Sequence, residues 1–206
     1  MESFSTEEQQ VEAIKRFWKE NGTAIILGAV IGLGGLWGWR YYNEQQIAGR
    51  EAASSQYEQL LGKLDSNDKG FTEAAEFIKQ NPDNSYALLT ALQLAKKAVD
   101  SKDFAEAQKQ LQWASEHAEN AAVKGTIQIR LARVQSEQQQ LDEALATLST
   151  VESSAFSATV EEVKGDVLVK QGKIDQARSA YSQSLELNAN NPLLQLKLDN
   201  LAATSE

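Results

Sequence analysis

The residues that could carry out chemistry in this sequence are few and scattered. The chain has one histidine, His117, and no cysteine among its 206 residues. Thiol catalysis, disulfides, and metal sites built from cysteines or several histidines are therefore excluded. The adjacent acids Glu161–Glu162 and Asp142–Glu143 stand at expected starts of helices or hairpins, where negative charge suits the helix dipole. We expect His117 to be a solvated residue near a helix end, and we expect no enzyme, no metal and no cofactor.

Residues 28–38 are rich in glycine, as phosphate-binding loops are. They lack the lysine and the Ser/Thr of such a loop and are too apolar for one. They belong instead to residues 23–39, TAIILGAVIGLGGLWGW, a run without a single charge. A helix from Gly22 through Tyr42 would be about 30 Å long, which matches the hydrocarbon thickness of a bilayer. We predict a single transmembrane helix over residues 23–42.

Aromatic and glycine side chains fit this interpretation. Amphipathic rings favour the headgroup zone of a membrane, and the predicted interface residues are Trp18, Trp37, Trp39, Tyr41 and Tyr42. Glycines at G-x-x-x-G spacing let a second helix approach closely, and the strip consists of Gly28, Gly32, Gly34, Gly35 and Gly38. We predict a helix-contact role for the strip; the alternative is that glycine is simply common in membrane helices.

A cleavable signal peptide is the main alternative to a permanent anchor. It would need a short basic region and a cleavage site of small residues. Here the segment before the apolar run carries five acids and three bases, and Arg40-Tyr41-Tyr42-Asn43 follows the run. We therefore predict an uncleaved signal anchor. Lys15, Arg16 and Lys19 precede it and favour a cytoplasmic N-terminus, which places the C-terminal part in the periplasm of a Gram-negative bacterium.

The segment before the span is predicted to be a cytoplasmic amphipathic segment, residues 1–22. Val11, Ile14, Phe17 and Trp18 recur at helical spacing on one face. Two interpretations stay open: the segment is a mere anchor, or it is a docking helix for a cytoplasmic partner.

The remaining residues, 43–206, are predicted to form one helical domain. They hold 24 acidic and 16 basic residues, a net charge of −8, which argues against nucleic-acid binding. Helix formers dominate and strand signals are absent. The fold class expected for the chain is therefore all-α, with an N-terminal transmembrane helix followed by helical hairpins.

A repeat supports these hairpins. Residues 158–191 match a tetratricopeptide-like pattern, with Gly165 at a small position where two helices touch, Gly172 in the turn, and Tyr181 between hairpins. Small residues recur upstream at intervals of 33, 37 and 33, and they are Ala74, Ala107, Ala144 and Ala177. Gly62 is the expected small residue of the first hairpin. We predict an α-solenoid of tetratricopeptide-like hairpins.

The concave side of such a solenoid is lined by outward residues of the first helix of each hairpin. On this chain the pattern selects Leu89, Leu92, Lys96, Val99, Ile129, Arg133, Glu162, Val169 and Lys170. A groove that mixes apolar and basic positions would suit a peptide segment; for the apolar residues the alternative is the core. After Pro192, the leucines of residues 193–201 form an apolar face that needs cover from the last repeat or from a partner.

Four sequence pieces resemble one known family: QVEAIKRFWKENG (10–22), GWRYYN (38–43), SYALLTALQLAKK (85–97) and IRLARVQ (129–135). They resemble the YfgM-type ancillary subunit of the SecYEG translocon. The resemblance implies a single-span inner-membrane protein with a periplasmic tetratricopeptide-like domain. It also implies association with SecYEG and with a membrane-anchored periplasmic parvulin-type chaperone, and a role in handing secreted or outer-membrane client proteins to chaperones.

The resemblance brings no catalytic residues, and it suggests a second role for the cytoplasmic tail in envelope-stress signalling. Three hypotheses follow: a scaffold at the export channel, a stress-signalling regulator, and a homo-oligomeric scaffold without a role at the translocon.

Overall fold

A computed structural model of the protein describes residues 7–64 and 69–203. Within these ranges the chain is made of helices joined by short turns and contains no strand, so the predicted all-α class is confirmed. The chain divides into two compact units, Met1–Ala52 and Ala53–Glu206.

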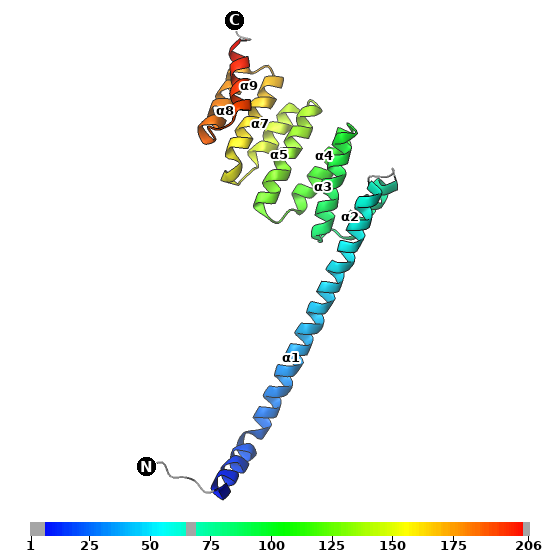
Figure 1. The fold of residues 1–206 in the computed structure, drawn as a ribbon, viewed down its shortest axis with the longest axis vertical. Helices are drawn as coiled ribbons and strands as arrows, with labels where there is room; N and C mark the ends of the chain where they lie inside the picture. Colours follow the sequence, from blue (N-terminus) through cyan, green and yellow to red (C-terminus); the bar gives the residue numbers. More distant parts are fainter. Residues whose placement is uncertain (1–6, 65–68, 204–206) are drawn as a thin grey trace, which may run out of the picture. The chain divides into compact units, whose positions relative to one another are not determined.

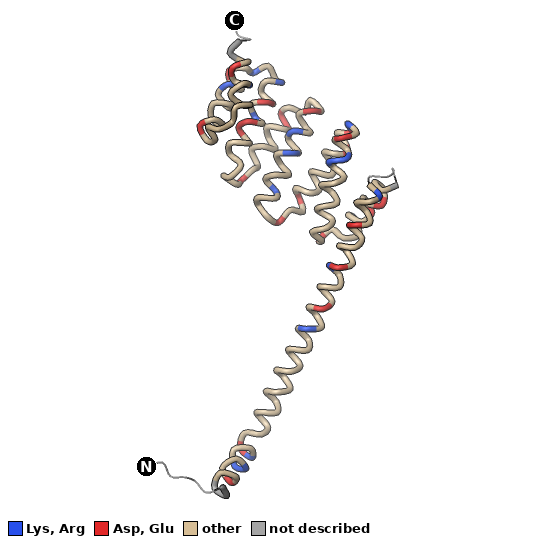
Figure 2. The backbone as a smooth tube through the Cα atoms, viewed as in Figure 1, with Lys and Arg blue, Asp and Glu red and all other residues tan. Residues whose placement is uncertain are grey.

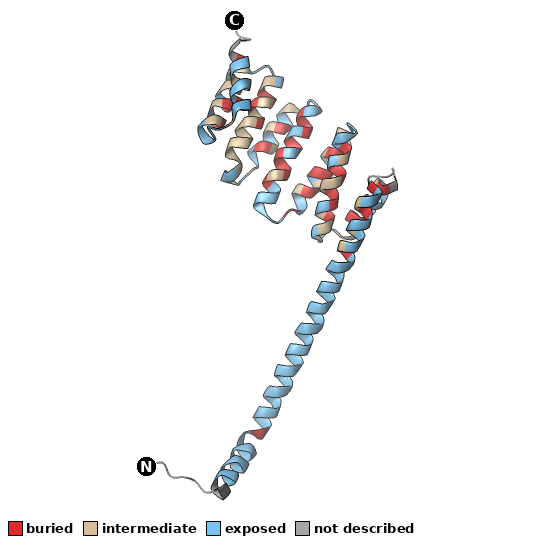
Figure 3. Cartoon of the chain, in the orientation of Figure 1, coloured by how far each residue is buried: buried red, intermediate tan, exposed pale blue. Residues whose placement is uncertain are grey.

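The N-terminal unit consists of most of one long helix, α1 (Glu7–Leu64), which runs without a break past the predicted span. From Gln10 onward its side chains are exposed along this unit, including large apolar ones such as Leu33 and Trp37 (Figure 3). In the described part of the chain, it is the one helix long and apolar enough to cross a membrane. Charge returns after the apolar run, where Arg40 pairs with Glu44 at 2.9 Å.

The C-terminal unit begins with the last residues of α1 and continues through eight α-helices in the described range. They are α2 (Lys69–Gln80), α3 (Ser85–Asp100), α4 (Phe104–His117), α5 (Ala121–Glu137), α6 (Leu141–Ser149), α7 (Ser157–Lys170), α8 (Ile174–Leu187) and α9 (Pro192–Ala203), with a short 3-10 turn at Ser154–Phe156. Helices that follow one another in sequence lie side by side as hairpins (Figure 1). Contacts therefore run mainly between neighbours, as in a solenoid.

Three of the hairpins share one turn geometry. Each turns through three residues, and the middle one has a left-handed backbone: Lys102 (φ 61°), Gln139 (φ 63°) and Gly172 (φ 73°). The third residue of each turn donates its N–H to a carbonyl five residues earlier, which closes the preceding helix. These bonds are Asp103 to Ala98 (2.8 Å), Gln140 to Gln135 (2.9 Å) and Lys173 to Leu168 (2.9 Å). Glycine adopts this backbone most easily, so the predicted place of Gly172 is confirmed.

The four alanines of the sequence repeat, Ala74, Ala107, Ala144 and Ala177, are fully buried, each with 0% of its surface exposed. They mark the same packing position in successive hairpins, where a larger side chain has no room. In the last hairpin, a β-carbon on Gly165 would collide with the ring of Tyr181.

The expectation for Gly62 is wrong. A β-carbon at Gly62 would meet open space. The buried residues of this stretch of α1 are Ala53, Leu60 and Leu64, which share a helix face through their spacing of seven and four, whereas Gly62 lies on the other side.

The C-terminal helix folds back on the last repeat. Leu194 and Leu201 of α9 are buried in one cluster with Ala177 and Tyr181 of α8. Leu193 and Leu196, in contrast, are exposed. The expected apolar face is thus half covered by the chain itself.

A polar cluster fastens α9 to α7. The ammonium of Lys197 donates to Glu162 Oε1 at 3.1 Å and to Asp166 Oδ1 at 2.8 Å. The hydroxyl of Tyr181 donates to the same Asp166 oxygen at 2.7 Å. Burial raises the pKa of the Tyr181 hydroxyl, and the hydrogen bond and charge of Asp166 raise it further. Burial alone lowers the pKa of Lys197, but the bonds and charges of Asp166 and Glu162 outweigh it and raise this pKa above its ordinary value.

Candidate protein-binding groove

The candidate residues for chemistry lie apart and already have partners. Nδ1 of His117 is 2.9 Å from the carbonyl oxygen of Trp113, and the two rings are stacked with centroids 4.0 Å apart. Asp142 accepts a hydrogen bond from Gln171, and Glu161 pairs with Lys164. Within residues 7–64 and 69–203, no group of three His, Cys, Asp or Glu side chains could hold a metal ion.

A hollow with a volume of about 550 Å³ lies between α3 and α5. Its apolar lining comes from α3, with one residue each from α4 and α5: Leu89, Leu92, Ala95, Val99, Leu111 and Val134. We call this hollow the α3–α5 groove. It brings together five of the predicted groove residues, namely Leu89, Leu92, Lys96, Val99 and Arg133.

Helical periodicity explains why α3 can serve both the core and the groove. Ala87, Ala91 and Leu94 are buried on one side of this helix. Leu89 and Val99 lie on the other side and are 42% and 38% exposed. The sequence spacing alone therefore divides α3 into a core face and a groove face.

Side-chain caps fix where the two groove helices begin. Asn84 accepts a hydrogen bond from the N–H of Tyr86 at 2.9 Å, and so starts α3. Asn120 does the same for α5 by accepting from Ala122 at 2.9 Å and Val123 at 3.2 Å. Asparagine is a favoured residue at this position because its side chain satisfies N–H groups that have no partner inside the helix.

Basic side chains border the groove. Lys96 of α3 and Arg130 and Arg133 of α5 line it, with Asp100 as the one acidic residue of the lining. In the described ranges, none of the three basic side chains forms an ion pair. Arg130 is absent from the sequence-based selection. The signal that would have found it is its spacing of three from Arg133, which puts both on one helix face.

The other predicted groove residues lie elsewhere. Ile129 is 5% exposed and packs in the core with Ala132 and Val163, so the core alternative holds for it and its place in the groove is corrected. The next residue, Arg130, turns outward instead, since successive helix residues point about 100° apart.

The three candidates on α7 belong to contacts between helices. Glu162 accepts from Lys197 at 3.1 Å and therefore belongs to the cluster that holds α9. Val169 is half-buried against the last hydrophobic cluster. Lys170 reaches back to α5, where it pairs with Glu137 at 2.9 Å and bonds the carbonyl of Ser136.

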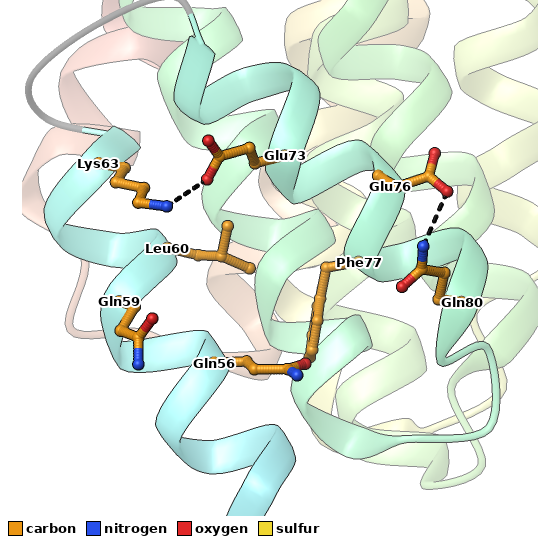
Figure 4. A pocket seen from close by; sticks show the side chains of 8 residues that line it. All are labelled: Gln56, Gln59, Leu60, Lys63, Glu73, Glu76, Phe77 and Gln80. Atoms are coloured by element: carbon orange, nitrogen blue, oxygen red, sulfur yellow. Dashed lines mark hydrogen bonds and ion pairs between the residues drawn. The ribbon is translucent and has the colours of Figure 1, made fainter.

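A smaller hollow of about 290 Å³ lies in the first hairpin, between the end of α1 and α2. Figure 4 shows Leu60 and Phe77 filling the space between the helices, while Lys63 pairs with Glu73 at 2.5 Å across its mouth. Glu76 accepts from Gln80 at 2.9 Å. The charges here are satisfied within the hairpin, in contrast to those of the α3–α5 groove.

Comparison with known proteins agrees with this architecture. The family described as "Tetratricopeptide repeat-like domain" matches residues 15–203. The ancillary SecYEG translocon subunit of Escherichia coli is 35% identical over 205 residues, which cover 98% of this chain and 100% of that protein. The protein of the same name from Aggregatibacter actinomycetemcomitans is 37% identical, with 95% and 97% covered. The chain belongs to the family of ancillary SecYEG translocon subunits.

The resemblance found in the sequence is thereby confirmed, and the family is one of translocon subunits rather than of enzymes. Solved structures agree on the fold of the chain. MamA from Desulfovibrio magneticus superposes with a TM-score of 0.59 at 13% identity, covering 76% of this chain and 85% of MamA. PilF from Pseudomonas aeruginosa gives 0.56 at 21% identity, covering 76% and 71%. Both likenesses concern the fold alone.

Proposed function

We propose that the protein is a non-enzymatic, membrane-tethered scaffold at the SecYEG protein-export channel. In this role its tetratricopeptide-like domain links translocating proteins to the periplasmic chaperone network. The observation that carries the proposal is the 35% identity over 98% of the chain to a protein named ancillary SecYEG translocon subunit. The exposed apolar stretch of α1 and the open α3–α5 groove support the tethering and the binding function, respectively.

The proposed topology follows from the sequence. The protein crosses the inner membrane once, through residues 23–42, with residues 1–22 in the cytoplasm and residues 43–206 in the periplasm. The aromatic residues Trp18, Trp37, Trp39, Tyr41 and Tyr42 would then lie at the two interfaces. The glycine strip would contact membrane helices of the channel.

The proposed partners are SecYEG itself, a membrane-anchored periplasmic chaperone of the parvulin type, and secreted or outer-membrane client proteins. Purification of the tagged protein from detergent-solubilised membranes tests the first two. We expect channel subunits and the chaperone to co-purify. Recovery of the protein only with itself would overturn the proposal and favour a homo-oligomeric scaffold.

A second candidate function is regulation of envelope-stress signalling through the cytoplasmic segment. The observation that favours it is the exposure of Val11, Ile14, Phe17 and Trp18 on α1. Site-specific photo-crosslinking from Ile14 and from Val99 separates the two functions. Crosslinks from Ile14 to a cytoplasmic regulator support the second, and crosslinks from Val99 to periplasmic proteins support the first.

A further inference from the structure

The helices that form the α3–α5 groove differ in charge from their surroundings. α3 has two basic residues and one acidic residue, and α5 has three basic residues and one acidic residue. Of the helices in the described ranges, these are the two with a net positive charge. They stand in a segment, residues 43–206, whose net charge is −8, and Figure 2 shows the basic positions along both helices.

The basic side chains of the groove are also available. Lys96, Arg130 and Arg133 form no ion pair within the described ranges, although acids are in excess throughout the domain. Lys164, Lys170 and Lys197 have carboxylate partners, whereas Lys102, Lys124 and Lys173 lack one in the described part of the chain but lie apart from the groove. The groove differs in bringing three unpaired basic side chains together. A positive surface without partners on an acidic domain attracts and orients a negatively charged ligand.

The apolar lining narrows the chemistry of that ligand. Leu89 and Val99 are exposed beside the basic side chains and lose contact with water when an apolar group covers them. No aromatic residue lines the groove, so it offers no platform on which nucleic-acid bases could stack. Apolar side chains and carboxylates on one chain are features of a peptide.

We propose that the α3–α5 groove binds a peptide segment of a partner protein in which apolar side chains stand next to Asp or Glu carboxylates. The apolar side chains lie on Leu89, Leu92 and Val99. The carboxylates pair with Arg130, Arg133 and Lys96, and guanidinium groups suit such pairs because they can donate two parallel hydrogen bonds. The inference rests on the proposed function in one respect, since it names the chemistry of the segment that the scaffold would recognise.

The test uses the full chain in lipid nanodiscs and three short fluorescent peptides. The first contains leucines and glutamates, the second has glutamine in place of glutamate, and the third has serine in place of leucine. We expect the first to bind, with an affinity that falls as salt is added. We expect each analogue to bind at least about tenfold more weakly, because it lacks one of the two kinds of contact.

Matched variants locate the site. Arg130→Gln combined with Arg133→Gln should weaken binding of the first peptide about tenfold, whereas Lys124→Gln, on the same helix but outside the groove, should leave it unchanged. Val99→Ser should weaken binding, whereas Val123→Ser should not. Val99 and Val123 are 38% and 40% exposed, so the two substitutions perturb the fold to a similar degree.

Several outcomes would overturn the inference. Equal binding of the glutamine analogue would refute carboxylate recognition, and equal binding of the serine analogue, or displacement by a DNA oligonucleotide, would refute a peptide with apolar contacts. If Lys124→Gln weakened binding as much as the two arginine substitutions do, the peptide would bind outside the α3–α5 groove. The variant with both arginine substitutions should still co-purify with SecYEG, because its membrane anchor is intact. This result separates the peptide-binding proposal from the proposed function at the export channel.

Discussion

Gly165 of α7 lies directly against the ring of Tyr181 of α8, where even a β-carbon on residue 165 would collide with the ring. The ring cannot move away easily, because its hydroxyl donates to Asp166 at 2.7 Å and the side chain is buried. The two helices of the last hairpin can therefore pack this closely only because residue 165 has no β-carbon.

Gly165→Ala should therefore destabilise the last hairpin by about 1–3 kcal/mol, the usual range for overpacking. Gly62→Ala is the matched control. It lies in a helix with open space around it, so alanine should be neutral or stabilise by up to about 1 kcal/mol through its higher helix propensity. Chemical unfolding of the full chain in detergent, followed by far-UV circular dichroism, measures both. Equal midpoints for the two variants would contradict the role of Gly165.

Two turn residues with left-handed backbones predict changes in stability of opposite sign. Gln139 has a φ of 63°, in the left-handed region that costs a residue with a β-carbon about 1 kcal/mol. Gln139→Gly should stabilise the chain by up to about this amount, and Gly172→Ala should destabilise it by a similar amount. Lys173→Gly is the control, because Lys173 has a φ of −87° and glycine there only adds flexibility to the unfolded chain. A loss of stability in Gln139→Gly would show that its side chain, rather than its backbone, determines the turn.

The cluster around Tyr181 predicts a loss of stability at alkaline pH. The folded state raises the pKa of Tyr181 and of Lys197, so it holds both protons more tightly than the unfolded chain does. The resulting stabilisation is present in full below the unfolded pKa values, near 10 for tyrosine and 10.4 for lysine, and is lost as pH rises through the folded values. Unfolding midpoints measured from neutral pH to above pH ~10 should fall at the alkaline end. Tyr181→Phe should fall less steeply, and an identical slope would remove Tyr181 as a cause.

The hairpins could be predicted from the sequence because the contact between two helices restricts residue size. Ala107, Ala144 and Ala177 recur at repeat spacing for this reason, and all are fully buried. The groove was only partly predictable. Ile129 and Arg130 are adjacent and differ in which side of α5 they occupy, and that depends on how α5 packs against α4, α6 and α7. The spacing of three between Arg130 and Arg133 puts both on one helix face, but it does not show which neighbouring helix that face meets.

Contacts between residues that are far apart in the sequence could not be predicted from the sequence either. Lys197 pairs with Glu162, 35 residues earlier, so Glu162 belongs to the contact between α7 and α9. The exposed position of Gly62 follows from the register of the first hairpin, which the spacing of the alanines did not determine. Local residue types therefore predicted the hairpins, whereas the tertiary arrangement decided which polar residues remain free for a partner.

The glycine strip of α1 makes a prediction about partners rather than stability. A β-carbon at Gly32 or Gly35 would meet nothing within 4 Å, so Gly32→Leu and Gly35→Leu should leave the helix and its membrane insertion intact. Both should reduce co-purification with other membrane proteins, because leucine prevents close helix approach. Leu33→Phe is the control, because Leu33 is not three or four residues from any glycine of the strip and so lies on another side of α1. Unchanged recovery of partners with both glycine variants would show that the strip is only a matter of composition.

The absence of cysteine from the sequence allows a direct test of topology. Glu20→Cys and Gln112→Cys each introduce a single thiol at an exposed position, one on either side of the predicted span, and the unchanged chain gives the background. The basic residues Lys15, Arg16 and Lys19 before the span favour a cytoplasmic N-terminus. A membrane-impermeant maleimide added to cells without their outer membrane should therefore label Gln112→Cys at once and Glu20→Cys only after the inner membrane is opened. The reverse pattern would show that the protein has the opposite orientation in the membrane. Labelling of both thiols in intact spheroplasts would show that α1 does not span the membrane.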